Sequence, residues 1–169
     1  NANSGHIGGA FSATEIAVSL YFNEMTINAN NVLDKVRDKF VLSKGHASAL
    51  LFAVLSEKGF LPEEELLTFR KINSRLQGHP NMNYVQGVDM STGSLGQGLS
   101  AAVGMALSYK IYKDDFRVYS LVGDGESQEG QIWEAAMAAG HYKLDNLCAI
   151  MDMNGLQIDG DVTKVMNPY

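Results

Sequence analysis

The sequence predicts an α/β fold in which a parallel sheet is flanked by helices on both faces, giving three layers. Helix-like and strand-like apolar segments alternate along the chain, as they do in such folds. The region 117–152 has the order strand, glycine-rich turn, helix and strand, which indicates a βαβ unit. With 169 residues, 46% of them hydrophobic and 19% charged, the chain is long enough to bury one continuous core. No repeat or linker divides it, so we expect a single α/β domain.

A capping box marks the first predicted helix. Glu15 follows Ser12 at the spacing of this pattern, so we expect Ser12 to be the N-cap of a helix that runs to Phe22. Four further elements are expected before residue 113. They are a strand over 40–42, a helix over 47–58 that ends at Gly59, a helix whose first turn holds Pro62 and the acids of 63–65, and a long, largely buried helix over 99–112.

The predicted βαβ unit has strands over 117–122 and 146–152, with a helix over 131–139 between them that Gly140 closes. Ligands of parallel sheets bind in the loops that follow the strands, so the turns after these two strands are candidate sites. Cys148, the only cysteine, lies in the second strand, and we expect it to be a buried core residue rather than a nucleophile. One cysteine allows no internal disulfide, which favours a reducing, cytoplasmic location.

Composition argues against two classes of function. The net charge is −6 and no cluster of Lys and Arg is visible, so we expect no nucleic-acid partner. The apolar stretches are too short to span a bilayer, so we expect no membrane association. No secretory leader is visible, but the chain begins abruptly at Asn1, and we expect its natural start to be missing.

The strongest local signal is Gly123-Asp124-Gly125, directly after the first strand of the βαβ unit. Glycine permits unusual backbone angles and close approach to a ligand, although such a turn is also common without any ligand. Asn154 favours a ligand-binding turn over an ordinary one, because it follows the second strand, 30 positions after Asp124. Two side-chain oxygens from adjacent strand ends suit Mg²⁺, which takes few protein ligands and completes its octahedron with water and phosphate oxygens.

Every histidine in the chain follows a glycine, although only 17 of the 169 residues are glycine. A Gly-His pair places an imidazole on a tight turn, where it can serve acid–base chemistry near neutral pH. His6, His46 and His79 lie in glycine-rich, loop-like segments, where active-site residues concentrate. For His141 we favour a structural role, because Gly140 is expected to end a helix and His141 would simply follow it.

These motifs, in this order, resemble those of transketolases. They are Ser4-Gly5-His6, Leu42-Ser43-Lys44-Gly45-His46, Gly78-His79-Pro80, Thr92-Gly93-Ser94-Leu95-Gly96-Gln97-Gly98, Gly123-Asp124-Gly125, Glu129-Gly130-Gln131-Ile132-Trp133-Glu134-Ala135 and Asp152-Met153-Asn154. The Gly-Asp-Gly turn and its downstream Asn are shared by all thiamine diphosphate enzymes, whereas the Gly-His sites are more specific. The resemblance implies a thiamine diphosphate-binding fold, Mg²⁺–thiamine diphosphate as cofactor, and transfer of a two-carbon ketol unit between sugar phosphates.

The resemblance also implies a role for each matching residue. Mg²⁺ would be ligated by the side chains of Asp124 and Asn154 and by the main-chain carbonyl of Leu156. The cofactor would be contacted by His46, Gly93, Ser94, Leu95, Gly123, Asp124, Gly125, Glu126 and Asn154. His6 and His79 would bind substrate hydroxyls and move protons, and Glu129 and Glu134 would join a buried acid network that links paired active sites. The alternative for these two glutamates is an ordinary acidic first turn of a helix.

The sequence departs from the family pattern at two positions. Met153 precedes Asn154 where many members have a second asparagine, but the metal-ligand position is kept. Ser94 replaces a proline found in many members, which should change the stiffness of the loop more than its chemistry.

The resemblance implies that residues 1–169 are a diphosphate-binding domain, incomplete at both ends. The pyrimidine-binding domain, whose glutamate activates the cofactor, is absent from this chain. The partner that we therefore expect is a complementary domain or a C-terminal transketolase subunit, in a homodimer or heterotetramer. We expect no catalysis by the isolated module.

Two alternatives remain open from the sequence. The protein could be a relative that acts on a sulfo-sugar or a branched-sugar phosphate, since the residues that recognise the phosphate would lie outside this chain. It could also be a regulatory module that binds the cofactor without turnover. The intact set His6, His46, His79, Asp124 and Asn154 argues against the regulatory role.

Overall fold

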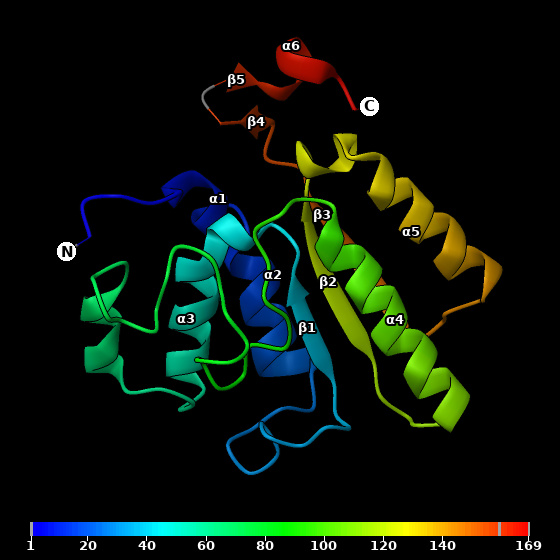
Figure 1. The fold of residues 1–169 in the computed structure, drawn as a ribbon, viewed down its shortest axis with the longest axis horizontal. Helices are drawn as coiled ribbons and strands as arrows, with labels where there is room; N and C mark the ends of the chain where they lie inside the picture. Colours follow the sequence, from blue (N-terminus) through cyan, green and yellow to red (C-terminus); the bar gives the residue numbers. More distant parts are fainter. Residues whose placement is uncertain (1, 159, 169) are drawn as a thin grey trace.

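The computed structural model describes residues 2–158 and 160–168 and confirms the predicted α/β fold (Figure 1). Within these residues, a parallel sheet has the strand order β1-β2-β3. Its strands are β1 (Lys39–Leu42), β2 (Val118–Gly123) and β3 (Leu147–Asp152). All three are parallel, so their carboxyl ends meet at one edge of the sheet, where loops can form a ligand site.

The side chains on the two faces of the sheet belong to different hydrophobic clusters. Successive side chains of a strand point to opposite faces, and β1 and β2 follow this rule. Phe40, Leu42, Tyr119 and Leu121 belong to one cluster, and Val41, Val118 and Val122 belong to the other. The sheet is therefore the middle of three layers, as the run of apolar residues in these strands predicts.

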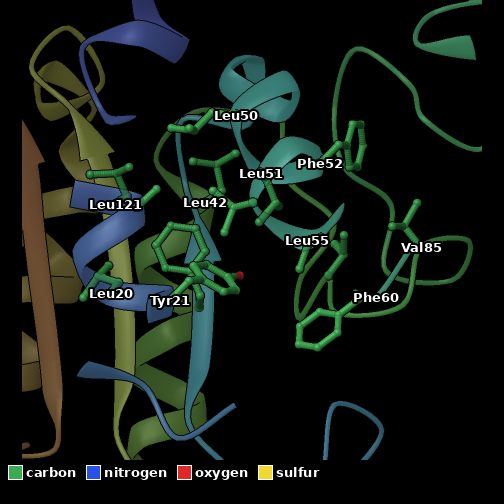
Figure 2. Close-up of a cluster of buried hydrophobic side chains, with 14 of the residues drawn as sticks. Leu20, Tyr21, Leu42, Leu50, Leu51, Phe52, Leu55, Phe60, Val85 and Leu121 are labelled. Atoms are coloured by element: carbon green, nitrogen blue, oxygen red, sulfur yellow. The ribbon is translucent and has the colours of Figure 1, made fainter. Parts of the chain in front are cut away.

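One face of the sheet is covered by α2 (Thr14–Ser19), which continues into the π-helical turn η1 (Leu20–Glu24), and by α3 (Ser48–Glu57). Figure 2 shows Tyr21 of η1 and Leu51 of α3 close to Leu42 of the sheet. Burying one such side chain contributes about 1.5–3 kcal/mol. This cluster holds α2 and α3 against β1, and so fixes the loops that leave the upper edge of the sheet.

The other face is covered by α4 (Gln97–Tyr112) and α5 (Gly130–His141), which lie side by side in Figure 1. Small residues let α4 approach the sheet closely. Ala102 and Ala106 are fully buried, and a Cβ on Gly98 would lie only 2.5 Å from Ser43 Oγ. Gly96 begins the helix in the left-handed region at φ +87°, a conformation that favours glycine.

The remaining elements are short. They are α1 (Ile7–Phe11), the 3₁₀ turns η2 (Gly45–Ala47), η3 (Glu63–Thr68) and η4 (Glu126–Gln128), the hairpin strands β4 (Leu156–Gln157) and β5 (Gly160–Asp161), and α6 (Val162–Met166). Of these, α1, η4 and β4 lie beside the carboxyl edge of the sheet (upper part of Figure 1). None of the helices in the described part of the chain is both long and apolar enough to cross a membrane.

The predicted N-cap at Ser12 is wrong. A separate helix, α1, precedes it, and the amide of Ser12 donates to Gly8 O at 3.0 Å as part of that helix. The N-cap of α2 is Ala13, which makes no side-chain capping bond. The hydroxyl of Ser12 instead donates to Asp152 Oδ2 at 2.5 Å, a partner that the local pattern cannot reveal.

Two other predicted helix ends differ from the structure. Gly140 does not close α5, which continues through His141, and the left-handed position after the helix is taken by Lys143 at φ +52°. The helix predicted after Pro62 is a 3₁₀ helix with Pro62 at its N-cap. The predicted end of α3 is confirmed, because Gly59 follows it with φ +77°.

Cys148 is exposed, contrary to the prediction that it is buried. β3 pairs on one side with β2, and among the described residues no strand pairs with its other side. Leu147 and Ile150 pack partly against the two clusters, whereas Cys148 and Ala149 stay open. The apolar sequence of β3 predicted burial, but the described part of the chain covers this strand only in part.

Candidate active site

Asp124 and the loop that carries Asn154 meet at the carboxyl edge of the sheet. β2 and β3 pair with Gly123 opposite Asp152, so the two predicted loops leave the sheet side by side. The Asp124 carboxylate is buried and accepts from two main-chain amides, Gly125 N on Oδ1 and Gly155 N on Oδ2, both at 2.7 Å. The second bond joins Asp124 to the residue after Asn154. The spacing argument thus correctly predicted that these loops are adjacent.

Both the oxygen and the nitrogen of the Asn154 side-chain amide form hydrogen bonds. Oδ1 accepts from Leu156 N at 2.9 Å, and Nδ2 donates to Ser12 Oγ and Asp152 Oδ2 at 3.4 and 3.5 Å. Leu156 lies next to it in β4, with an exposed side chain. In the described ranges no three His, Cys, Asp or Glu side chains come together as a metal cluster.

The donor set of this loop pair fits Mg²⁺. A carboxylate, an amide oxygen and a main-chain carbonyl are the hard oxygen ligands that this ion takes from proteins. Amide donors to Asp124 orient the carboxylate, as outer partners commonly do for metal ligands. The glycines keep the backbone accessible, and a Cβ on Gly125 would lie 3.0 Å from Gln157 Cγ. A residue larger than glycine at 125 would press against the side chain of Gln157 in β4.

Glu126 is a buried carboxylate that ties three segments together. Oε1 accepts from Ser43 Oγ at 2.6 Å and from Gly96 N at 2.9 Å, and Oε2 accepts from Gly123 N at 3.1 Å. The predicted cofactor-contact residue therefore lies at the turn, with its carboxylate directed to donors of the chain itself. Its visible effect is to hold the turn after β1, the start of α4 and the end of β2 in register.

The segment with Gly93, Ser94 and Leu95 passes over the turn that carries His46. A Cβ on Gly45 would lie 2.7 Å from the carbonyl carbon of Thr92, so the two backbones touch. Gly93 has φ +148° and would, with a Cβ, come within 2.9 Å of His79 Cδ2. Ser94 and Leu95 are exposed. Glycine is required at both contacts because any side chain would separate the segments.

Three of the four histidines gather beside these loops. The rings of His6 and His46 meet edge to face, with centroids 5.1 Å apart, and His79 lies against Gly93. Burial is the main cause that lowers the pKa of His46 to about 4, and Lys44 and the other two histidines act in the same direction. His46 is therefore neutral at pH 7, able to donate through one ring nitrogen and accept through the other.

His79 is more exposed than His46 but is also shifted toward the neutral form. Burial lowers its pKa, and the nearby charges of Arg70 and His6 lower it further. Perturbed histidines in a cluster are typical of functional sites. An open cavity of about 860 Å³, lined by His6, His46 and Arg70 among mostly apolar residues, adjoins the cluster.

The remaining candidates belong to α5, and of these Glu129 lies beside Gly96, since a Cβ there would be 3.0 Å from Glu129 Cβ. His141 is exposed in the last turn of α5, where its ring meets that of Tyr142 edge to face. Glu129 is the exposed N-cap of α5, and Glu134 is exposed one turn later. The described part of this chain does not bury either glutamate, so a buried acid network would need a second surface against α5.

Sequence reasoning assigned no role to Lys44 or Asp152, although both lie inside quoted motifs. Lys44 is fully buried and its Nζ donates to Asp152 Oδ2 at 2.5 Å. The signal that could have revealed them is a lysine inside an otherwise apolar and small-residue strand end, since buried lysines need a partner.

Comparison with known proteins gives one family. The family model described as "Transketolase, thiamine diphosphate binding domain" matches residues 1–168. The 6-deoxy-6-sulfo-D-fructose transketolase subunit of Clostridium sp. (strain MSTE9) is 49% identical over 97% of this chain and 59% of its own length. An apulose-4-phosphate transketolase subunit of Phocaeicola vulgatus is 46% identical over 98% of this chain and 59% of its length.

Longer relatives agree. The transketolase of Mus musculus is 53% identical over 92% of this chain and 25% of its own length. The crystal structure of transketolase from Campylobacter jejuni superposes with a TM-score of 0.91 at 39% identity, covering 98% of this chain and 27% of that one. The chain thus spans about three fifths of its subunit-type relatives and about a quarter of the longer ones. It belongs to the transketolase family, as a thiamine diphosphate-binding domain.

Proposed function

We propose that residues 1–169 are the Mg²⁺–thiamine diphosphate-binding part of a transferase that moves a two-carbon ketol unit between sugar phosphates. The observation that carries this proposal is the meeting of Asp124 with the Asn154 loop, joined by the 2.7 Å bond from Gly155 N. A candidate metal site beside a cluster of three histidines matches the needs of ketol transfer better than those of a simple binding module.

In this proposal the chain supplies the anchor for the cofactor. Asp124, Asn154 and the carbonyl of Leu156 would ligate Mg²⁺. His46 and the turn of Gly123, Gly125 and Glu126 would lie against the diphosphate, and Gly93, Ser94 and Leu95 would line the cofactor rings. When bound, thiamine diphosphate supplies a nucleophilic carbon and accepts the electrons of the broken C–C bond.

The histidines would handle the protons of the substrate. A neutral imidazole can accept a proton from a sugar hydroxyl at its unprotonated nitrogen and return it later. His6 and His79 stand at the open side of the cluster, which suits contact with the substrate. His46 is held neutral with a pKa of about 4, so at pH 7 it would serve as a hydrogen-bond partner of the cofactor rather than as an acid.

The proposed partners are a pyrimidine-binding domain or a C-terminal subunit, in a homodimer or heterotetramer. Support comes from α5, where Trp133 and Met137 are exposed apolar side chains on the helix that carries Glu134. A partner covering this helix would bury both glutamates. The single cysteine of the chain fits our proposed cytoplasmic location.

We distinguish three candidates for the role of the complete protein. Ordinary sugar phosphates of the pentose phosphate type are the leading candidate. A sulfo-sugar or a branched-sugar phosphate is a second candidate, favoured by the names of the two subunit-type relatives. A regulatory module that binds the cofactor without turnover is a third, and the intact histidine cluster argues against it.

A ketol-transfer assay on the complete protein tests the proposal. It would use Mg²⁺, thiamine diphosphate and pentose phosphates, with the chain alone and with its complementary domain. We expect activity only when both parts are present. Turnover of sulfo-sugar or branched-sugar phosphates alone would select the second candidate. Cofactor binding without turnover of any of these sugars would contradict the enzyme and favour the regulatory module.

A further inference from the structure

We propose that Lys44, Asp152 and Ser12 form a positioning network that sets which end of the Asn154 amide is offered to a cation. The network draws Nδ2 toward Asp152 and so leaves Oδ1 as the atom for a metal. This inference rests on the proposed function, in which Asn154 is a metal ligand. It assigns a role to three residues that the proposed function does not use.

Lys44 and Asp152 form an ion pair that crosses the middle strand. Lys44 follows β1 and Asp152 ends β3, and β2 lies between these strands. The two side chains are 1% and 6% exposed, and Nζ lies 2.5 Å from Oδ2. A buried charge pair is a poor source of net stability, because desolvation offsets its attraction. We therefore infer that this pair, next to the candidate metal loop, positions side chains of the loop rather than adding stability.

A single oxygen of Asp152 receives all the donors of the network. Oδ2 accepts from Lys44 Nζ and from Ser12 Oγ, each at 2.5 Å, and more weakly from Asn154 Nδ2 at 3.5 Å. Ser12 Oγ also accepts from Asn154 Nδ2 at 3.4 Å. Since Oγ donates its one proton to Asp152, only its lone pairs face Asn154. Both neighbours of Nδ2 are therefore acceptors.

This arrangement distinguishes the two ends of the amide. An NH₂ group facing two acceptors is favourable, whereas an oxygen in the same place would face a carboxylate and hydroxyl lone pairs. Oδ1 is consequently on the other side, where it accepts from Leu156 N. A flipped amide would present NH₂ to a cation, which is repulsive. The long distances to Nδ2 mean that the preference depends on the charge of Asp152 more than on short hydrogen bonds.

Ser12 extends the network to the segment that carries His6. It ends α1, and His6 is the N-cap of the same helix. α1 also lies directly on the turn of Lys44 and His46, since a Cβ on Gly9 would be 3.5 Å from Lys44 Nζ and 3.3 Å from the His46 ring. The carboxylate of Asp152 therefore contacts both the end of α1, through Ser12, and the side-chain amide of Asn154.

The test is a double-mutant cycle measured as the apparent Kd for Mg²⁺ in the complete enzyme with thiamine diphosphate. Calorimetry measures binding without turnover, and the fluorescence of Trp133, whose Nε1 donates to Ser127 O, is a second readout. Ser12→Ala and Asp152→Asn are made in the natural background and in Asn154→Asp. A carboxylate at 154 has two equivalent oxygens and needs no orientation.

In the natural background we expect Asp152→Asn to weaken Mg²⁺ binding by about 10- to 100-fold, as loss of an outer partner of a metal ligand does. Ser12→Ala should also weaken Mg²⁺ binding, but by a smaller factor than Asp152→Asn. In the Asn154→Asp background neither substitution should weaken binding, because either oxygen of the carboxylate can face the cation, and Asp152→Asn also removes the repulsion between the two carboxylates. Ser19→Ala and Asp145→Asn, outside the network, should leave the Kd unchanged in both backgrounds.

Equal losses in the two backgrounds would overturn the inference, because they would mean that the network only supports the fold. An unchanged Kd for Ser12→Ala and Asp152→Asn would overturn it as well. If Asp152→Asn does not fold, the Ser12→Ala pair decides the question alone. Failure of the proposed function is a separate result, in which the unaltered enzyme binds no Mg²⁺–thiamine diphosphate or Asp124→Ala binds it normally.

Discussion

His46 combines burial with a positive neighbourhood, which makes its neutral form the stable one in the folded chain. Its pKa falls from 6.5 to about 4, so the folded protein resists protonation there while the unfolded chain does not. Between these two values the unfolded state binds more protons, and stability must fall as the pH falls. The same sign applies to His79, whose pKa is also lowered.

The first prediction concerns this pH dependence. His46→Gln should reduce the loss of unfolding free energy between about pH 6.5 and pH 4, because the titrating group is removed. Denaturant unfolding of the complete protein at several pH values in this window measures it. His141→Gln, at an exposed position on α5, is the control and should leave the dependence unchanged. An unaltered slope for His46→Gln would show that the imidazole is not held neutral.

The second prediction concerns Arg70, a half-buried residue with φ +61°. Its guanidinium lies so close to Gly78 that a Cβ there would be 2.7 Å from Nη2. This charge is the second cause, after burial, of the lowered pKa of His79. Arg70→Gln should therefore raise the pKa of His79, measured by NMR titration of the imidazole. Arg117→Gln, at the opposite end of β2, should not. No change in Arg70→Gln would contradict the assigned cause.

At the scale of elements, α4 depends on close contact at its start and not at its middle. Gly98 packs its Cα against Ser43, whereas a Cβ on Gly104 would meet nothing within 4 Å. Both glycines lie in the same helix, so they form a matched pair in which only the packing differs. The start of α4 also reaches the Glu126 carboxylate, to which Gly96 N donates at 2.9 Å.

The third prediction uses this pair. Gly98→Ala should destabilise the fold by about 1–3 kcal/mol, the cost of overpacking a tight contact. Gly104→Ala should stabilise it by about 0.5–1 kcal/mol, because alanine is the better helix former. Thermal and denaturant unfolding measure both. Equal effects of the two substitutions would contradict the close packing of α4 on the turn after β1.

The elements could be predicted where the signal is local. The βαβ unit was readable because apolar strands, a glycine turn and a helix follow one another within 117–152. Helix ends were less readable, since Gly140 matches a C-terminal signal but Lys143 takes the left-handed position. Ser12 matched a capping box and instead donates to Asp152, 140 residues away. Local patterns cannot report such partners.

The candidate site could be predicted in part for the same reason. Asp124 and Asn154 follow strands of one βαβ unit, and parallel pairing brings their loops together. Lys44 could not be assigned, because its buried position depends on Asp152, 108 residues later. Cys148 was mispredicted because a strand sequence does not tell which of its surfaces this chain covers. The proposed roles of His6, His79, Glu129 and Glu134 stay predictions.

At the scale of the whole molecule, two hydrophobic clusters pack against the sheet, and the candidate site lies at the carboxyl edge of that sheet. Segments from distant parts of the chain meet there: α1, the turn of Lys44 and His46, the 93–95 segment and the two loops after β2 and β3. Such a site forms only when the whole domain is folded. Cofactor binding should therefore raise the unfolding temperature of the domain, by mass action.

The most direct test of the central claim is calorimetric binding of thiamine diphosphate in the presence of Mg²⁺, using the complete protein, Asp124→Ala and His79→Ala. We expect Asp124→Ala to lose Mg²⁺-dependent binding, by more than the roughly 10- to 100-fold that follows loss of an outer partner of a metal ligand. His79→Ala should bind the cofactor normally and turn over substrate more slowly. Normal binding by Asp124→Ala would contradict the assignment of the metal site.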